Sequence, residues 1–426
     1  MSKKRLVNQL QNLALLLLTV SALFLLTRLP MVQNIRWPDQ VPGLFSGGPP
    51  AGGQEAGETP AGMFASVHLM VTGDSQYGRC GLLCTGADDA GLQSIVPLFR
   101  EALGSAVPVG PAEDEDFRAA LEGPGVYLEL SAGPLPLEAV GIWLGEETGE
   151  EPGFSMVLRA MALTAGGSEA AELYLLDDQG GITLCRTALP ISAVQSVCDD
   201  FSPNGADFAY KTHDMLSPYT VLASADPAPD ALPSLPAGYS VYNLLTALGF
   251  NAHTLSRYRE SGGAEVVEES PCTLRIGPEG AVSFTSRGVD VPSLFRASGP
   301  GLREALAAAW RLVSALTEGT GASPVYLSGV QAREEGWRLS FRYQADGVPV
   351  VFSNEEDALA VAFTGGAITS FTYRCRSYAL AEEEPAELLP AFIAQAIAAD
   401  YPGSRLSVSY VDDGSERLTA QWRRTD

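Results

Sequence analysis

The longest apolar stretch of the chain lies at its beginning. Residues 13–26 are apolar except for one Thr and one Ser, and three basic residues at positions 3–5 precede them. No acidic residue occurs before Asp39. This pattern indicates either a signal peptide or a signal anchor. Residues 10–29 provide about 20 residues, which is the length that a membrane-spanning helix needs.

No small-residue cleavage site follows this stretch, so we expect an uncleaved anchor. Residues 1–30 would then form a short cytoplasmic tail and a single transmembrane helix. The positive-inside rule places the rest of the chain outside the cell, as an extracellular ectodomain on the cell membrane. A cleaved secretory signal is the alternative, and it also places the rest outside.

Two segments without apolar periodicity divide the remaining chain. Residues 43–62 are rich in Gly, Pro, Ala and Glu and predict a flexible tether. Residues 223–238 contain four prolines and predict a stiff linker. We therefore expect a first α+β ectodomain at residues 63–221. A weak internal repeat beyond the linker suggests a second domain at residues 239–300 and a third at residues 301–426.

Short alternating segments predict the strands of the first domain, and longer periodic segments predict its helices. The helices are expected at residues 88–103, where the apolar residues fall on one face, and at residues 191–201. The strands are expected at residues 64–71, 77–84, 126–130, 139–144, 154–161, 172–176 and 182–185. Residues 177–181 have the composition of a hairpin turn between the last two strands.

Beyond the linker, a helix is twice followed by a set of antiparallel strands. Helices are expected at residues 242–248, 302–317 and 386–400. Strands are expected at residues 264–268, twice within 272–284, and at 325–330, 337–343, 348–352, 358–363, 367–373, 406–411 and 418–422. Residues 358–371 repeat the pattern of residues 272–284, with apolar alternation around a Gly turn. Alternation also predicts that Trp337 and Phe352 are core residues.

The predicted fold class is therefore α+β. An N-terminal transmembrane helix is followed by domains of antiparallel sheet and helix, and the C-terminal part is a weak duplication.

Charge is distributed unevenly along the chain. All 51 acidic residues lie after Trp37, but only 22 of the 27 basic residues do. Such a negative field repels nucleic acid and anionic lipid, and it keeps the protein soluble. Lys211 is the only lysine beyond the N-terminal tail. We therefore expect no nucleic-acid partner.

Six cysteines are spread along the chain. In an exported protein an even number permits disulfides, and buried free thiols fit the same count equally well. The first two are spaced as C-x-x-x-C, which is neither a zinc spacing nor a thioredoxin-type motif. They would point to one face of a strand. The six are Cys80, Cys84, Cys185, Cys198, Cys272 and Cys375.

The search for catalytic chemistry gives no candidate. The three histidines, His68, His213 and His253, have no partner at metal-ligand spacing. Residues 73–75 are similar to an esterase nucleophile block, but the Asp-x-x-His that such enzymes need is missing, so a turn is favoured. The acidic runs at residues 113–116 and 382–384 fit solvated helix starts better than calcium sites. We predict no enzyme, and no catalytic, cofactor-binding or metal-binding residue.

A C-terminal stretch resembles the conserved end of the YycH/YycI proteins of Gram-positive bacteria. In these proteins a strand leads into a G-x-P-V-F hairpin, and a G-x-I-x-x-F/Y strand follows. The resemblance covers residues 337–352 and 358–378. The matching residues are Gly347, Pro349, Val350 and Phe352, with Val351 inserted, and then Gly366, Ile368 and Phe371.

The resemblance implies a regulatory role without catalytic residues or cofactors. Members of this family act beside the membrane sensor histidine kinase WalK and adjust a two-component regulatory system that controls cell-wall homeostasis. It implies protein–protein contact through both the transmembrane helix and the ectodomain, and a paralogous YycH/YycI protein as a further partner. The tether at residues 43–62 and the strong negative charge depart from the family. The alternative is a cell-wall-associated binding module or hydrolase that is exported by the anchor.

Overall fold

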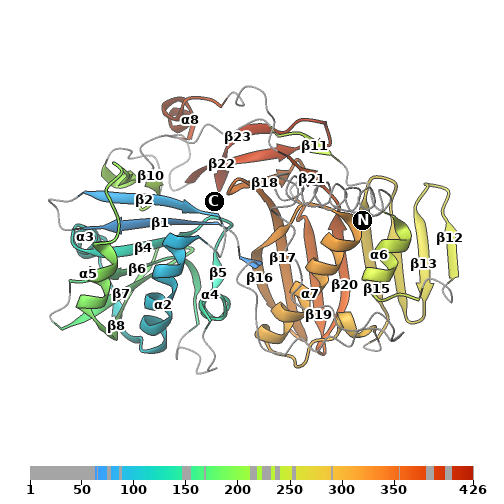
Figure 1. Ribbon diagram of the computed structural model, residues 1–426, viewed down its shortest axis with the longest axis horizontal. Coiled ribbons are helices and arrows are strands. Elements are labelled where there is room, and N and C mark those ends of the chain that lie inside the picture. Colours follow the sequence, from blue (N-terminus) through green and yellow to red (C-terminus); the bar gives the residue numbers. More distant parts are fainter. Residues whose placement is uncertain are drawn as a thin grey trace, which may run out of the picture. The chain divides into compact units, whose positions relative to one another are not determined.

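The structure is a computed structural model of the chain. It describes residues 63–64, 66–73, 78–85, 89–145, 155–166, 169–211, 218–222, 232–235, 240–251, 256–288, 291–354, 356–379, 388–398 and 405–425. These residues belong to one compact unit, Ala56–Asp426. The expected anchor at residues 1–30 and the expected tether at residues 43–62 lie outside the described residues. Within the described part, no helix is long and apolar enough to cross a bilayer. Two large sheets and their helices confirm the α+β class (Figure 1).

The first sheet is built from residues of the expected first ectodomain. It has eight strands in the order β2-β1-β4-β6-β7-β8-β3, with β5 beside β6, and every pairing is antiparallel. The strands are β1 (Val67–Thr72), β2 (Arg79–Cys84), β3 (Val107–Pro111), β4 (Gly125–Leu130), β5 (Leu135–Pro136), β6 (Val157–Thr164), β7 (Ala170–Asp177) and β8 (Ile182–Pro190).

Both faces of this sheet are covered. On one face the helices α2 (Ala90–Gly104), α4 (Leu137–Leu144) and α5 (Ile191–Cys198) pack on the strands. On the other face lie α3 (Asp114–Ala120), the short helix η2 (Ala209–Lys211) and the small strand pair β9 (Asp207–Phe208) and β10 (Val221–Leu222). A second core forms there around Phe117, Tyr127 and Phe208.

This domain differs from the sequence prediction in several elements, of which α4, β3 and α3 are the longest. Residues 139–144 were expected as a strand and instead belong to helix α4. All of its residues except Glu138 are buried, so the run is uniformly apolar and carries no period that separates helix from strand. Strand β3 was not predicted, and helix α3 was indicated only by the acidic run at residues 113–116. β3 contains Pro108 and Pro111, which suit an edge strand and weaken its sequence signal.

The second sheet has eleven strands and includes one parallel pair. Its order is β12-β13-β14-β15-β20-β19-β17-β18-β22-β23, with β16 beside β17, and β18 and β22 are the parallel pair. The strands are β12 (Ser256–Arg259), β13 (Glu265–Glu269), β14 (Cys272–Ile276), β15 (Ala281–Ser286), β16 (Val325–Arg333), β17 (Gly336–Ala345), β18 (Val348–Phe352), β19 (Leu359–Thr364), β20 (Ala367–Arg374), β22 (Arg405–Asp412) and β23 (Thr419–Thr425).

One face of this sheet is covered by the helices α6 (Val241–Ala247) and α7 (Leu302–Thr320) and by the short helix η3 (Ser293–Phe295). The two α-helices meet closely: a Cβ built on Gly319 would lie 3.1 Å from the Cα of Leu244. Phe295 stacks on Phe284, with ring centroids 4.5 Å apart. The predicted core position of Phe352 fits its burial, whereas Trp337 is only half-buried at the end of its strand and donates to the carbonyl of Pro300.

The sheet continues across the expected boundary at residues 300 and 301. β15 lies before this boundary and β20 after it, and the two strands pair from Ala281 to Thr285. Residues 239–300 and 301–426 therefore contribute to one sheet and one apolar core. The two hairpins with similar sequence, β14–β15 and β19–β20, lie side by side in it.

The final strands are fixed by a buried polar cluster. Asp412, whose side chain is fully buried, pairs with Arg376 at 3.2 Å and accepts a hydrogen bond from the hydroxyl of Tyr378 at 2.9 Å. Tyr378 belongs to β21 (Ser377–Tyr378), which pairs with β11 (Ser234–Leu235) from the predicted stiff linker. This described part of residues 223–238 is therefore a strand. The predicted helix at residues 386–400 is seen as α8 (Ala391–Ala398).

All six cysteines are buried free thiols, so the structure contains no disulfide among them. Cys80 and Cys84 share one face of β2, as predicted. Burial, reinforced by Asp89, raises the pKa of Cys84 to about 12, and burial raises the pKa of Cys185 to about 11. These thiols pack as small apolar side chains.

Candidate functional site

The second sheet has an outward face that helices α6 and α7 do not cover. Five neighbouring strands, β14, β15, β20, β19 and β17, form its centre. Their inward residues, such as Leu274, Phe371 and Phe341, are buried. Because side chains alternate along a strand, the intervening residues point to the opposite face. We call this the open face; its central residues are Thr273, Arg275, Ser283, Thr285, Arg338, Ser340, Ala360, Ala362, Ser370 and Thr372.

The strand register arranges these residues in two rows. The first row runs Arg275, Ser283, Thr372, Ala360, Ser340, and the second runs Thr273, Thr285, Ser370, Ala362, Arg338. Each row crosses four strand intervals, so its ends lie about 19 Å apart. The middle of both rows contains only small side chains, and an arginine stands at opposite ends of the two rows.

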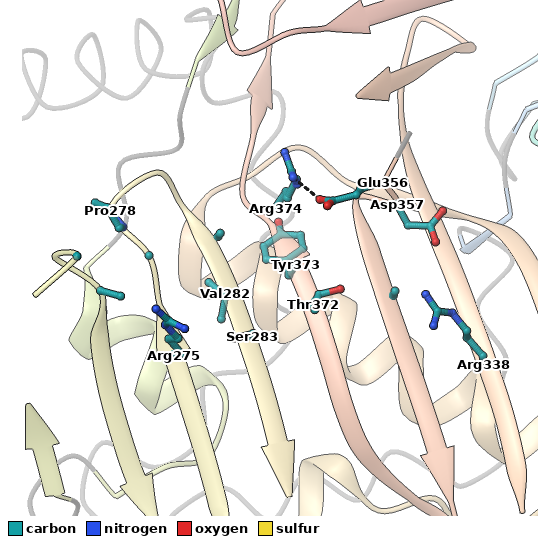
Figure 2. Close-up of a pocket in the computed structure, with 15 residues that line it drawn as sticks. Arg275, Pro278, Val282, Ser283, Arg338, Glu356, Asp357, Thr372, Tyr373 and Arg374 are labelled. Atoms are coloured by element: carbon teal, nitrogen blue, oxygen red, sulfur yellow. Dashed lines mark hydrogen bonds and ion pairs between the residues drawn. The ribbon is translucent and has the colours of Figure 1, made fainter. Parts of the chain in front are cut away.

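The upper part of the open face is hollowed into a shallow groove of about 750 Å³. Figure 2 shows Arg275 on one side of the groove and Arg338 on the other, with Thr372 and Ser283 between them. Glu356 and Asp357 close one end. Glu356 forms an ion pair with Arg374, and Asp357 accepts a hydrogen bond from Ser340 at 2.7 Å.

The charge of these strands is opposite to that of the chain as a whole. The five central strands contain four arginines, Arg275, Arg338, Arg342 and Arg374, and no Asp or Glu. The whole chain carries a net charge of −24. Arg275 pairs with Glu260 at 2.5 Å. Within the described residues, neither Arg338 nor Arg342 has a carboxylate within ion-pairing distance.

The composition of the open face limits what it can bind. Its central residues include no aromatic side chain on which a sugar ring or a base could stack. The arginines stand too far apart to converge on one small anion. The face offers hydroxyl groups, small side chains and separated guanidinium groups, which suit contact with a broad, flat partner.

The first sheet carries a polar cluster with a different role. Arg79 pairs with Glu122 at 3.0 Å and also with Asp207, and Lys211 pairs with Glu122 at 2.9 Å. Burial would raise the pKa of Glu122, but the hydrogen bonds from Lys211 and Tyr210 and the charge of Arg79 outweigh it and lower this pKa. The cluster holds the segment that covers the second face of the first sheet.

The structure describes only some of the polar residues that were considered from the sequence. His68 lies in β1, and burial lowers its pKa in spite of the opposing charge of Glu129. His213 and His253 lie outside the described residues, as do residues 74–75 and 382–384. The acidic run at residues 113–116 is exposed and forms the start of α3, as predicted. In the described part of the chain, no group of three or more His, Cys, Asp or Glu side chains is placed to hold a metal ion.

Most of the residues that carry the YycH/YycI resemblance lie in turns or in the apolar core of the second sheet. Gly347 and Gly366 adopt positive φ angles of 79° and 78° in turns. Val350, Phe352, Ile368 and Phe371 are buried. The open face was not predicted, although Arg338 and Arg342 alternate with buried apolar residues in the sequence of β17.

Comparison with known proteins gives no match: no family, no curated protein and no solved structure is significantly similar to this chain. The resemblance to YycH/YycI proteins therefore stays an expectation that rests on its motif residues.

Proposed function

We propose that this protein is a membrane-anchored, extracytoplasmic regulator of a two-component sensor histidine kinase that controls cell-wall homeostasis, and that it acts by protein–protein contact without chemistry of its own. The N-terminal sequence supports a single-pass anchor with a cytoplasmic N-terminus. The motif residues at 347–352 and 366–371 support a relation to the YycH/YycI proteins, including a duplicated C-terminal part. The kinase would be WalK-like.

The observation that carries this proposal is the open face. Among the described residues, helices or chain segments cover both faces of the first sheet and one face of the second, whereas Arg275, Thr285, Arg338 and Thr372 on the open face are exposed. A regulator that works by contact needs such a rigid surface, and loops at its edge can add specificity.

A photo-crosslinking experiment tests the proposal directly. A photoreactive amino acid is placed at Thr372, in the middle of the open face, in the full chain expressed in its own cells. The expected result is an adduct whose second component is a membrane sensor histidine kinase, identified by mass spectrometry. The matched control places the same amino acid at Gln93, which is exposed on α2. A Thr372 adduct without kinase, or equal kinase adducts from both positions, would contradict the proposal.

The anchor is tested separately. Residues 13–26 are replaced with an unrelated apolar helix, which keeps the protein in the membrane but removes specific helix–helix packing. Kinase output should become uncoupled from the protein. Unchanged output would show that the ectodomain alone carries the regulation.

A further inference from the structure

We infer that the open face binds an acidic segment of a partner protein, with Arg338 and Arg342 as its main anchors. This inference deepens the proposed function, since it names the chemistry of the partner at the same surface. It starts from charge: four arginines and no carboxylate occur in the five central strands of a strongly acidic protein.

The anchors are chosen from the ion pairs. Arg275 and Arg374 already pair with Glu260 and Glu356, so their charges are partly neutralised. Arg338 and Arg342 stand four positions apart on β17, with Ser340 between them on the same side of the sheet, so both arginines point to the open face. No carboxylate of the described residues pairs with either of them. The two arginines start about 13 Å apart along the strand, so each can meet a different carboxylate of an extended partner segment.

The residues around the two arginines favour a protein segment as the ligand over a polyanion with regularly spaced charges. Glu356 and Asp357 stand at the upper end of the groove, where they would repel a chain of regularly spaced phosphates. A protein segment can place its carboxylates opposite Arg338 and Arg342 and leave neutral groups elsewhere. The small side chains of Ala360, Ala362 and Ser370 allow the backbone or helix of such a segment to approach closely.

A binding experiment with defined probes tests the inference. The full chain in nanodiscs is titrated with a fluorescent Glu-Ala repeat peptide and with the matched Gln-Ala repeat. Because the residues after Trp37 carry a net negative charge, binding of the Glu peptide must come from a local positive surface, either the open face or the basic residues 3–5, and substitutions on the open face separate the two. We expect the Gln peptide to bind at least about tenfold more weakly. Affinity for the Glu peptide should fall steeply between about 0.1 M and about 1 M salt, since salt screens exposed charges.

Substitutions locate the site. The double variant Arg338→Gln and Arg342→Gln should weaken binding of the Glu peptide about tenfold. The double variant with Lys at both positions keeps the charges and should keep most of the binding. The control Arg186→Gln removes an exposed arginine from strand β8 of the first sheet and should have no effect. Thermal melting of each variant shows whether it is folded.

Three results would overturn the inference: equal binding of the Glu and Gln peptides, full binding by the folded Gln double variant, or an equal loss in Arg186→Gln. Binding of poly(glycerol phosphate) that matches the Glu peptide and needs the same arginines would show a phosphate polymer as the ligand instead. Crosslinking at Thr372 separates this inference from the proposed function. A kinase adduct at Thr372 without binding of the Glu peptide would support the proposed regulatory function and overturn the inference of an acidic partner segment. Binding of the Glu peptide without a kinase adduct would support the acidic segment and contradict the kinase as the partner.

Discussion

Replacement of Phe284 by Ala tests whether residues 239–300 and 301–426 unfold as one unit. Phe284 lies in β15 and is fully buried. Its ring stacks on Phe295, and on Phe371 of β20 with centroids 5.4 Å apart. Phe371 is also its cross-strand partner. The side chain therefore joins the two halves across the expected boundary.

The size of the effect follows from this packing. Removing a buried Phe side chain costs about 3–5 kcal/mol, because the cavity adds to the lost transfer free energy. Aromatic pairs add about 0.5–1.5 kcal/mol beyond burial, so the upper part of that range is expected here. With an m-value of about 3 kcal/mol per molar urea, a loss of about 4 kcal/mol lowers the unfolding midpoint by about 1.3 M.

The reporters are Trp310 and Trp337, which both belong to residues 301–426. Urea unfolding is followed by fluorescence in a background in which the other three tryptophans are Phe, and by circular dichroism in parallel. If the halves are one unit, Phe284→Ala shifts the fluorescence transition by the full amount. Phe284→Leu is the control and should cost less than about 1.5 kcal/mol. A fluorescence midpoint that stays at its wild-type value while part of the dichroism is lost would refute the reasoning.

Three further predictions follow from buried and paired groups. None of the six cysteines should react with a thiol reagent in the native protein, and all should react in denaturant; a rapidly labelled native thiol would contradict their burial. Asp412→Ala should lower the free energy of unfolding by about 3–5 kcal/mol in urea titrations, because it leaves Arg376, whose side chain is only 17% exposed, without its carboxylate partner; a loss below about 1 kcal/mol would show a dispensable pair. Glu122→Gln should cost less than about 1 kcal/mol at pH 7, because its ion pairs are partly exposed. Since the folded pKa of Glu122 is lowered, this difference should be complete above the unfolded pKa near 4.5 and vanish as pH falls through the folded pKa, which melting curves at several pH values would show.

Much of the fold could be predicted because its elements carry clear periods. Helix α7 has an apolar stripe over nineteen residues, and the hairpin β14–β15 alternates regularly around Gly280. Helix α4 and strand β3 could not be predicted, because one is uniformly apolar and the other contains two prolines. The continuity of the second sheet across residue 300 depends on the pairing of β15 with β20, and local sequence carries no information on such pairing.

The open face could not be predicted from the sequence of any single strand. Within β17, the alternation of arginine and serine with buried apolar residues indicates only that one side meets solvent. The polar sides of the five strands join into one area because of the strand register. The helices α6 and α7 leave this area free because they pack on the opposite face of the sheet. Four arginines that are scattered from residue 275 to residue 374 come to lie on one surface only in the folded sheet. A chain whose composition argues against anionic partners thus presents, at one place, the surface that an acidic partner requires.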